Sequence, residues 1–144
     1  MMIEEPGAAR STKVHIEPDL ARGFVLVRVE GVLEMPEGQR VQAEVAAQYP
    51  GLHRLWDLRR SRLTNLTGPE IDAGIEAIAA RTPPAGAESV RVAALVADDF
   101  DFALSRMFEG MASRRLPMRY GVFRDEAEAI EWLLGVPHLG ERST

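Results

Sequence analysis

Alternating apolar and polar positions mark the first part of the chain. Val25, Val27 and Val29 occupy every second position of the segment 24–30, which predicts a β-strand with one buried face. The segment 12–17 precedes it across a short turn, so the two segments predict an antiparallel hairpin at the start of the fold.

Three later segments also predict strands, because each is a short apolar run bounded by turn residues. They are residues 52–58, 90–97 and 118–123. The middle segment is interrupted by a single charge, Arg91, as is expected of a parallel strand that is buried on both faces.

Apolar residues at helical spacing lie between these strands and after the last one. Val41, Val45 and Tyr49 recur every four residues and predict a helix that ends at Pro50-Gly51. Three further helices are predicted from their N-terminal capping residues and their apolar stripes. The caps are Thr67 with Glu70, then Asp98 or Asp99, and finally Asp125 with Glu128, whose helix ends at Gly135.

The predicted order is therefore β-β-α-β-α-β-α-β-α, in a single α/β domain over residues 12–135. Strands joined by helices run parallel through right-handed crossovers, so we expect a mainly parallel sheet of four or five strands. Residues 1–11 and 136–144 are predicted to be flexible tails of this domain.

The composition of the 144 residues fits one globular domain and limits the classes of partner that it could bind. Hydrophobic residues make up 46% and charged residues 27%, which are close to globular averages. The net charge of −5 argues against nucleic acid as a partner, because phosphate contacts need a basic surface. The N-terminus lacks a signal-peptide pattern and no apolar segment approaches the roughly 20 residues that span a bilayer. We therefore expect a cytoplasmic protein without a membrane span.

Chemistry that depends on particular motifs is excluded by inspection. The chain has no cysteine, so disulfides, thiolate metal sites and cysteine nucleophiles are absent. Neither of the phosphate-binding patterns G-x-x-x-x-G-K-[ST] and G-x-G-x-x-G occurs, nor does the nucleophile pattern G-x-S-x-G. His15, His53 and His138 fall in separate elements and are not expected to converge. We predict no cofactor, no metal and no catalytic residue.

The segment 56–68 is the richest in polar side chains and is the main candidate binding surface. It is predicted to leave the carboxyl end of a central strand and to run, as a loop over 59–68, into a helix. Its guanidinium and backbone N–H groups suit an anion or a partner's carboxylate, although a plain solvated connection explains them equally well. The candidate residues are Asp57, Arg59, Ser61, Arg62, Thr64, Asn65 and Thr67.

A second candidate is the acidic group formed by Asp98, Asp99 and Asp101, where the fourth strand meets the longest helix. Carboxylates at this place suit a hard cation or a polar ligand. Negative charge at the positive end of a helix is the simpler explanation. Asp98 and Asp99 are included among the candidate binding residues.

The order of the elements, residues 55–58 and the segment that leads into a capped helix resemble the STAS domain of anti-sigma-factor antagonists. Residues 92–99, 107–109 and 122–133 resemble more closely the SpoIIAA-like, STAS/SEC14-type proteins of bacteria. The resemblance covers about residues 12–135. It implies a four- or five-stranded sheet with helices mainly on one face, and binding of proteins or small ligands instead of catalysis.

Antagonists of this family are switched by phosphorylation of a serine in a turn that begins the second helix. The corresponding stretch holds Asn65, Leu66 and Thr67. Leucine cannot accept phosphate, so the resemblance does not extend to the usual phosphoserine switch. Thr67 and Thr64 are the remaining candidates for modification.

Three functions stay open at this point. A regulatory protein-interaction module without enzymatic activity follows from the resemblance. A carrier of a small apolar ligand or a lipid, of SEC14-like type, is the alternative. The third and most remote alternative function is a hydrolase that uses Asp57 or Asp98/Asp99 as general base.

Two further expectations concern surfaces. A homodimer is expected to form through an uncovered sheet face that carries Phe24, Leu26 and Arg28. A ligand pocket is expected to use flexible or aromatic side chains. Its candidate lining is Phe100, Phe102, Met107, Phe108, Met111 and Trp132.

Overall fold

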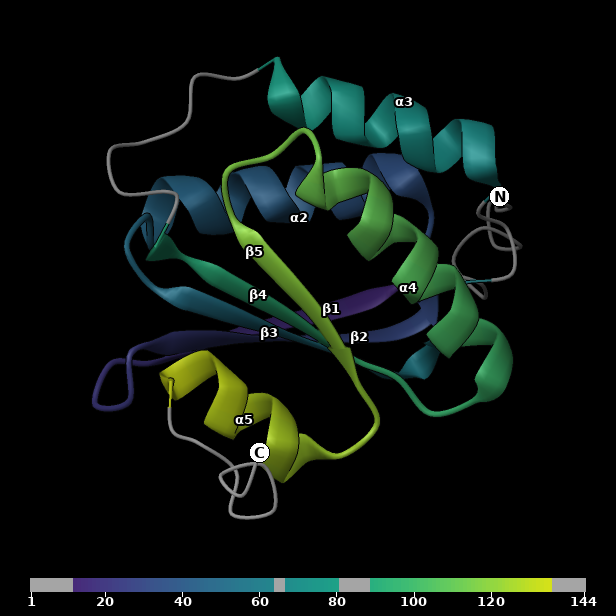
Figure 1. Ribbon diagram of the computed structural model, residues 1–144. Helices are drawn as coiled ribbons and strands as arrows, with labels where there is room; N and C mark the ends of the chain where they lie inside the picture. Colours follow the sequence, from purple (N-terminus) through teal and green to yellow (C-terminus); the bar gives the residue numbers. More distant parts are fainter. Residues whose placement is uncertain (1–11, 64–66, 81–88, 136–144) are drawn as a thin grey trace, which may run out of the picture.

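The computed structural model describes residues 12–63, 67–80 and 89–135. Strands and helices alternate along these residues as the hydrophobic pattern predicts (Figure 1). The elements are β1 (Lys13–Asp19), β2 (Phe24–Val32), α2 (Met35–Gln48), β3 (His53–Arg62), α3 (Gly68–Ala79), β4 (Arg91–Leu95), α4 (Asp99–Ser113), β5 (Arg119–Phe123) and α5 (Glu126–Leu134).

The strands form one sheet in the order β1-β2-β3-β4-β5. β1 pairs antiparallel with β2, as the predicted hairpin requires, and β2, β3, β4 and β5 pair parallel. The prediction of a mainly parallel sheet is therefore confirmed. Each parallel connection passes through a helix, which is the arrangement expected of crossover units.

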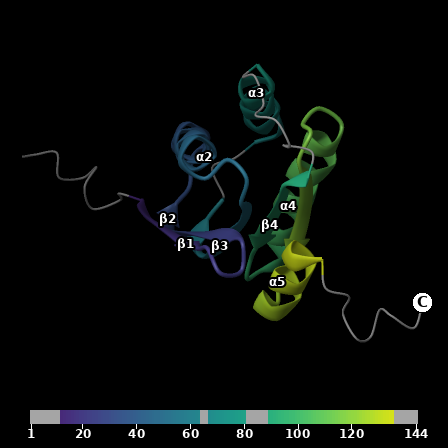
Figure 2. The ribbon, with the colours of Figure 1, turned by 90° about the vertical axis from the view of Figure 1, so that its left-hand side faces the viewer.

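The sheet separates two layers of helices. α2, α3 and α4 lie on one face, and α5 alone lies on the other (Figures 1 and 2). The valines at alternate positions of β2 pack under the three-helix layer together with Val41, Val45, Ile71 and Ile75. The opposite face carries a smaller core that α5 covers, and its buried members are Phe24, Leu55, Ala93, Leu95, Ala129 and Leu133.

The helix starts were predicted closely because capping is a local property of the sequence. Thr67 and Glu70 form the expected capping box of α3. Asp98 caps α4 by accepting from the backbone N–H of Asp101, and Asp125 caps α5 in the same way. α5 ends at Gly135, whose φ of 73° is the left-handed conformation that glycine adopts without steric cost.

Two expectations are wrong. Residues 59–62 are not a loop, because β3 extends to Arg62 and pairs with β2 through Arg60 and Ser61. Phe24 does not lie on an uncovered sheet face, because it is buried in the core beneath α5. Of the described helices, none combines the length and the apolar character needed to cross a membrane.

Candidate functional site

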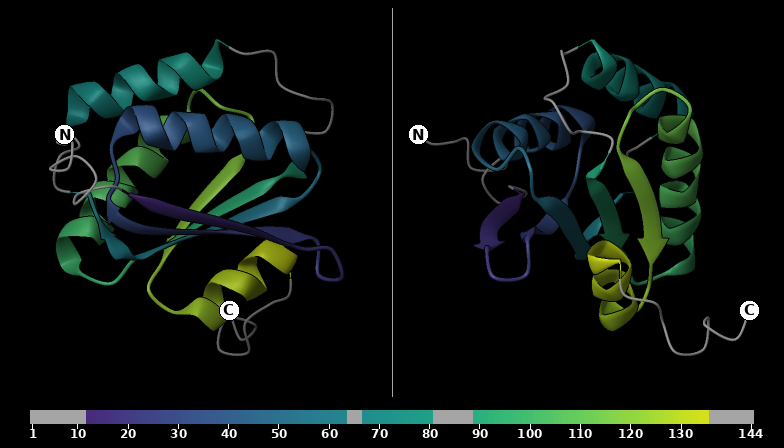
Figure 3. Two further views of the ribbon diagram at one scale, coloured as in Figure 1. Left: turned by 180° about the vertical axis from the view of Figure 1, so that it is seen from behind. Right: turned by 60° about the vertical axis from the view of Figure 1, so that its left-hand side comes forward.

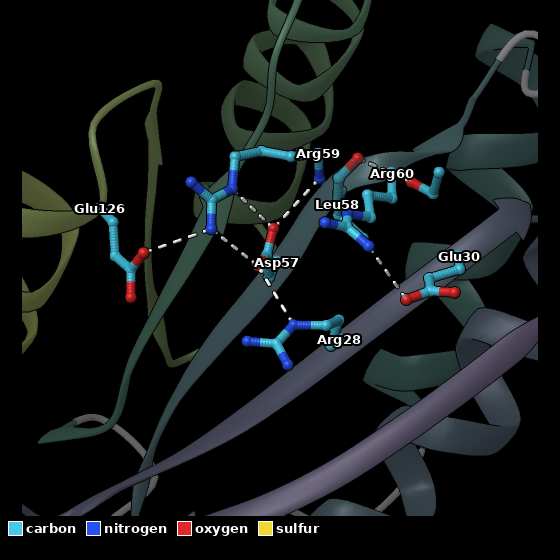
Figure 4. Close-up of polar contacts among 8 residues, drawn as sticks. Arg28, Glu30, Asp57, Leu58, Arg59, Arg60 and Glu126 are labelled. Atoms are coloured by element: carbon cyan, nitrogen blue, oxygen red, sulfur yellow. Dashed lines mark hydrogen bonds and ion pairs between the residues drawn. The ribbon is translucent and has the colours of Figure 1, made fainter.

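A cluster of charged side chains surrounds Asp57 on β3, on the sheet face that α5 covers in part (Figure 4). Arg59 holds the carboxylate with two hydrogen bonds, Nε to Oδ1 at 3.0 Å and a terminal guanidinium nitrogen to Oδ2 at 3.0 Å. The backbone N–H of Arg59 donates to Oδ1 at 3.2 Å, and Arg28 Nε approaches Oδ2 at 3.5 Å from β2. The carboxylate of Asp57 is therefore held from three directions by its own chain.

This cluster also connects the sheet to α5. The guanidinium of Arg59 reaches Glu126, the first residue of α5, at 3.2 Å. Burial raises the pKa of Asp57, but the hydrogen bonds and the charge of Arg59 outweigh burial and bring that pKa below its ordinary value. A carboxylate with a lowered pKa is a poor general base at neutral pH. Its contacts are those of a structural ion pair.

The other candidates of the segment 56–68 have separate contacts. Ser61 is buried and donates from its hydroxyl to the carbonyl of Leu58 at 2.9 Å. Arg62 is exposed at the end of β3. Thr67 is exposed, and its hydroxyl accepts from the backbone N–H of Glu70 at 3.3 Å. Thr64 and Asn65 lie outside the described residues.

The acidic group at the start of α4 is engaged in structural contacts. Asp98 caps the helix at 2.8 Å from the N–H of Asp101, and Asp99 forms an ion pair with Arg124. Asp101 is buried, and its carboxylate accepts from the backbone N–H of Leu63. Burial, and next the charge of Asp98, raise the pKa of Asp101. Asp101 therefore fastens the end of β3 to α4.

The two acidic candidates lie near the same ends of the strands but are held in different networks. Asp57 is the register partner of Leu95, the last residue of β4, and Asp98 follows three residues later. Asp57 is bound by arginines and linked to α5, whereas Asp98 belongs to α4 on the other face. Within residues 12–63, 67–80 and 89–135, no three His, Asp or Glu side chains gather as a metal ion requires.

A cavity of about 150 Å³ lies between the sheet and the three-helix layer. Its roof comes from all three helices, including Val45 of α2, Ile71 of α3 and Leu104 of α4. Its floor is formed by alternate residues of the three strands at the centre and edge of the sheet. These are Arg54, Trp56, Val92, Ala94, Tyr120 and Val122.

The burial of β4 shows that this cavity is accessible. Ala93 and Leu95, which face α5, have no exposed surface. Val92 and Ala94 face the three-helix layer in the middle of the sheet and are still only half-buried. A strand covered by packed helices on that side would be buried there too, so the helices stand away from the floor and leave it open.

Arg54 is a buried charged residue in the lining of this apolar cavity. Arg54 is only 5% exposed, and its Nε atom has no hydrogen-bond partner among the described residues. Burial lowers the pKa of Arg54, although a guanidinium remains charged throughout the physiological range. The sequence contained a signal for it, since strand alternation places Arg54 on the same face as Trp56 and Leu58.

The cavity differs from the pocket expected from the sequence. Of the aromatic and methionine side chains proposed for that pocket, only Phe108 lines the cavity. Trp132 packs against Phe123 on the α5 face, and Phe100 and Met107 are exposed. Five of the six expected residues therefore do not line this cavity.

A comparison with solved structures identifies the architecture. The chain is similar to an uncharacterised protein of the DUF3478 family, with a SpoIIAA-like fold, from Shewanella loihica PV-4. The TM-score is 0.51 at 16% sequence identity, and the alignment covers 85% of this chain and 93% of that chain. The SpoIIAA-like fold expected from the resemblance is thus confirmed. No protein-family model and no curated protein matches the sequence.

Proposed function

We propose that this SpoIIAA-like domain is a non-enzymatic binding module that holds a small ligand in the cavity between the sheet and α2, α3 and α4. The main support for this proposal is the size and the lining of the cavity. Its volume of about 150 Å³ equals that of an engineered apolar cavity that binds benzene. Apolar side chains form most of its lining, with a few polar groups among them, which is the usual composition of a ligand pocket.

The state of the carboxylates supports binding over hydrolysis. Asp57 is held by Arg59 and Arg28, and its pKa is lowered. Asp98 is engaged in capping and Asp99 in an ion pair. A hydrolytic mechanism would need one of these groups free beside an enclosed cleft.

The proposal is tested with a small neutral apolar compound, for which toluene is a suitable probe. Titration calorimetry is expected to show saturable binding of toluene to the full chain. Ala94→Leu adds three carbon atoms to the floor of the cavity and is expected to abolish this binding. It is also expected to stabilise the free protein by up to about 2 kcal/mol, at about 0.8 kcal/mol per buried methylene. The absence of toluene binding by the unaltered protein would contradict the proposal.

Native mass spectrometry supplies a second readout of the same proposal. Protein purified without denaturation from its own host is expected to carry a small molecule in part of the population, and Ala94→Leu is expected to be free of it. A retained compound in equal amount on both proteins would place its binding outside the cavity.

Protein docking is the second candidate, and the exposed apolar face of α4 favours it. Phe100 and Met107 are seven residues apart, which brings them to the same side of the helix, and both are exposed. Met107→Glu is expected to remove a specific partner that Arg60→Glu retains in cross-linked pull-downs. The homodimer remains a proposal of the same kind, and light scattering of the unaltered protein and of Met107→Glu tests it.

A further inference from the structure

Arg54 is the feature of the cavity that apolar binding alone leaves unexplained. Arg54 lines the cavity together with Trp56 and Val92, and its Nε atom is buried without a hydrogen-bond partner among the described residues. None of the ion pairs of the described residues includes Arg54. A buried cation without an anion is costly in a folded protein.

The other charges near the cavity do not compensate this cation. Glu109 of α4 also lines the cavity, but its carboxylate is paired with Arg106 at 3.0 Å. No carboxylate of the described residues is among the groups that shift the pKa of Arg54. Among the described residues, the cavity therefore holds one excess positive charge that an enclosed anion would neutralise.

Tyr120 provides a second polar group on the same row of the sheet. Arg54 is the register partner of Val92, and Val92 is the partner of Tyr120. Two strand spacings separate the backbones of Arg54 and Tyr120, about 10 Å, and Val92 lies between them in the same row. Burial raises the pKa of Tyr120 far above its ordinary value, so its hydroxyl stays protonated and carries a hydrogen that it can donate.

The geometry points to an apolar monocarboxylate as the ligand, with its carboxylate on the guanidinium of Arg54 and its apolar body over Ala94 and Val122. This inference rests on the proposed function, since it names the class of ligand for the same cavity. A guanidinium presents paired N–H donors in one plane, which match the two oxygens of a carboxylate. The volume of about 150 Å³ fits a single aromatic ring or a short aliphatic chain.

The experiment compares four probes on the full chain by titration calorimetry. Benzoate is the apolar carboxylate, benzamide its uncharged counterpart, toluene the neutral body without a polar head, and inorganic phosphate the anion without an apolar body. Benzoate is expected to bind at least about tenfold more tightly than benzamide, because charge-assisted hydrogen bonds are stronger than neutral ones. Phosphate is expected to bind at least about tenfold more weakly than benzoate, because it leaves the apolar lining empty.

The variants assign this preference to Arg54. Arg54→Met is expected to abolish the preference for benzoate over benzamide and to keep toluene binding. Removal of the uncompensated charge is also expected to raise the melting temperature of the free protein. Arg54→Gln keeps a polar side chain and serves the same comparison if the methionine variant does not fold. Arg60→Met is the matched control, because Arg60 lies on the same strand and its side chain is 78% exposed. The control is expected to leave the preference unchanged.

The outcomes separate this inference from the function on which it rests. If toluene binds but benzoate binds no more tightly than benzamide, the carboxylate is the wrong ligand class and the cavity remains a ligand site. If neither toluene nor benzoate binds, both proposals fail. Phosphate binding as tight as that of benzoate would overturn the apolar class, and an unchanged preference in the Arg54 variant would overturn the role of that arginine.

Discussion

Asp57→Asn is the substitution that best tests the ion-pair cluster on β3. Asp57 is 6% exposed and accepts two side-chain hydrogen bonds from Arg59, one from its backbone N–H, and a longer one from Arg28. Asparagine keeps the shape and one acceptor oxygen but removes the charge. Arg59 and Arg28 then lose their common counter-ion and, in the case of Arg59, keep only Glu126.

The loss of folding stability expected for Asp57→Asn lies between two limits. Removing one partner from a fully buried ion pair costs about 3–5 kcal/mol, and an exposed pair contributes about 0–1 kcal/mol. Asp57 is buried, but the side chains of Arg28 and Arg59 are 41% and 39% exposed and recover contact with water. We therefore expect a loss of about 2 kcal/mol, which corresponds to a decrease of about 4–8 °C in melting temperature for a domain of this size.

Urea unfolding at neutral pH, followed by far-ultraviolet circular dichroism, measures this loss. Asp99→Asn is the control, because Asp99 forms one ion pair and its side chain is 92% exposed, so its loss is expected to stay below about 1 kcal/mol. Equal losses for the two variants would refute the assignment of Asp57 as the centre of a buried cluster.

The pH dependence gives an independent readout of the same cluster. The pKa of Asp57 is lower in the folded protein than its ordinary value, chiefly because Arg59 offsets the effect of burial. The stabilisation is therefore complete above about pH 4 and is lost as the pH falls through the folded-state pKa. The difference in stability between the unaltered protein and Asp57→Asn is expected to shrink under acid conditions, and a constant difference would contradict this account.

Three further predictions follow from single contacts. Thr67→Ala removes the cap of α3 and is expected to cost about 1 kcal/mol in urea unfolding, whereas Thr67→Ser is expected to be neutral. Asp101→Asn keeps the acceptor for the N–H of Leu63 and removes a charge whose pKa is raised mainly by burial. Its stability at neutral pH is expected to equal or exceed that of the unaltered protein, and a large loss would contradict the raised pKa. His53 accepts from the N–H of Arg91 at 3.0 Å, and its pKa is lowered by burial first and by Arg91 next. Nuclear magnetic resonance titration is expected to give a midpoint below the ordinary 6.5, with stability decreasing as the pH falls through that midpoint.

Local signals made much of the fold predictable. Thr67, Asp98 and Asp125 each carry the side-chain oxygen that a helix start needs, and the structure places a helix start at all three. The alternation of Val25 to Val29 also identified the strand and its buried face. Such features depend on neighbours along the chain, so a sequence pattern contains them.

Features that depend on distant neighbours were harder to predict. Residues 59–62 lack the apolar alternation of a strand, and they are strand because β2 pairs with them. Asp57 is bound by Arg28 of β2, and its neighbour Arg59 is bound by Glu126 at the start of α5, which no spacing in the sequence brings together. α2, α3 and α4 come from three separate parts of the chain and form one layer on the sheet (Figure 3). The cavity depends on how this layer packs on the sheet, which involves residues far apart in the sequence.

The role of Arg54 could be predicted from the sequence only in part. Its position in the alternation of β3 marks a charged residue on an apolar face, which is a signal for a buried cation. That no described residue supplies a compensating anion, however, is visible only when the elements around the cavity have been placed.

Contacts between a bound probe and the cavity test the central claim most directly. With isotope-labelled protein and benzoate, nuclear Overhauser effects report which methyl groups lie within a few ångströms of the ring. The account predicts contacts to the methyl groups of Ala94 and Val122, which form the floor of the cavity. Contacts confined to exposed residues such as Met107, or no contacts at saturating benzoate, would contradict it.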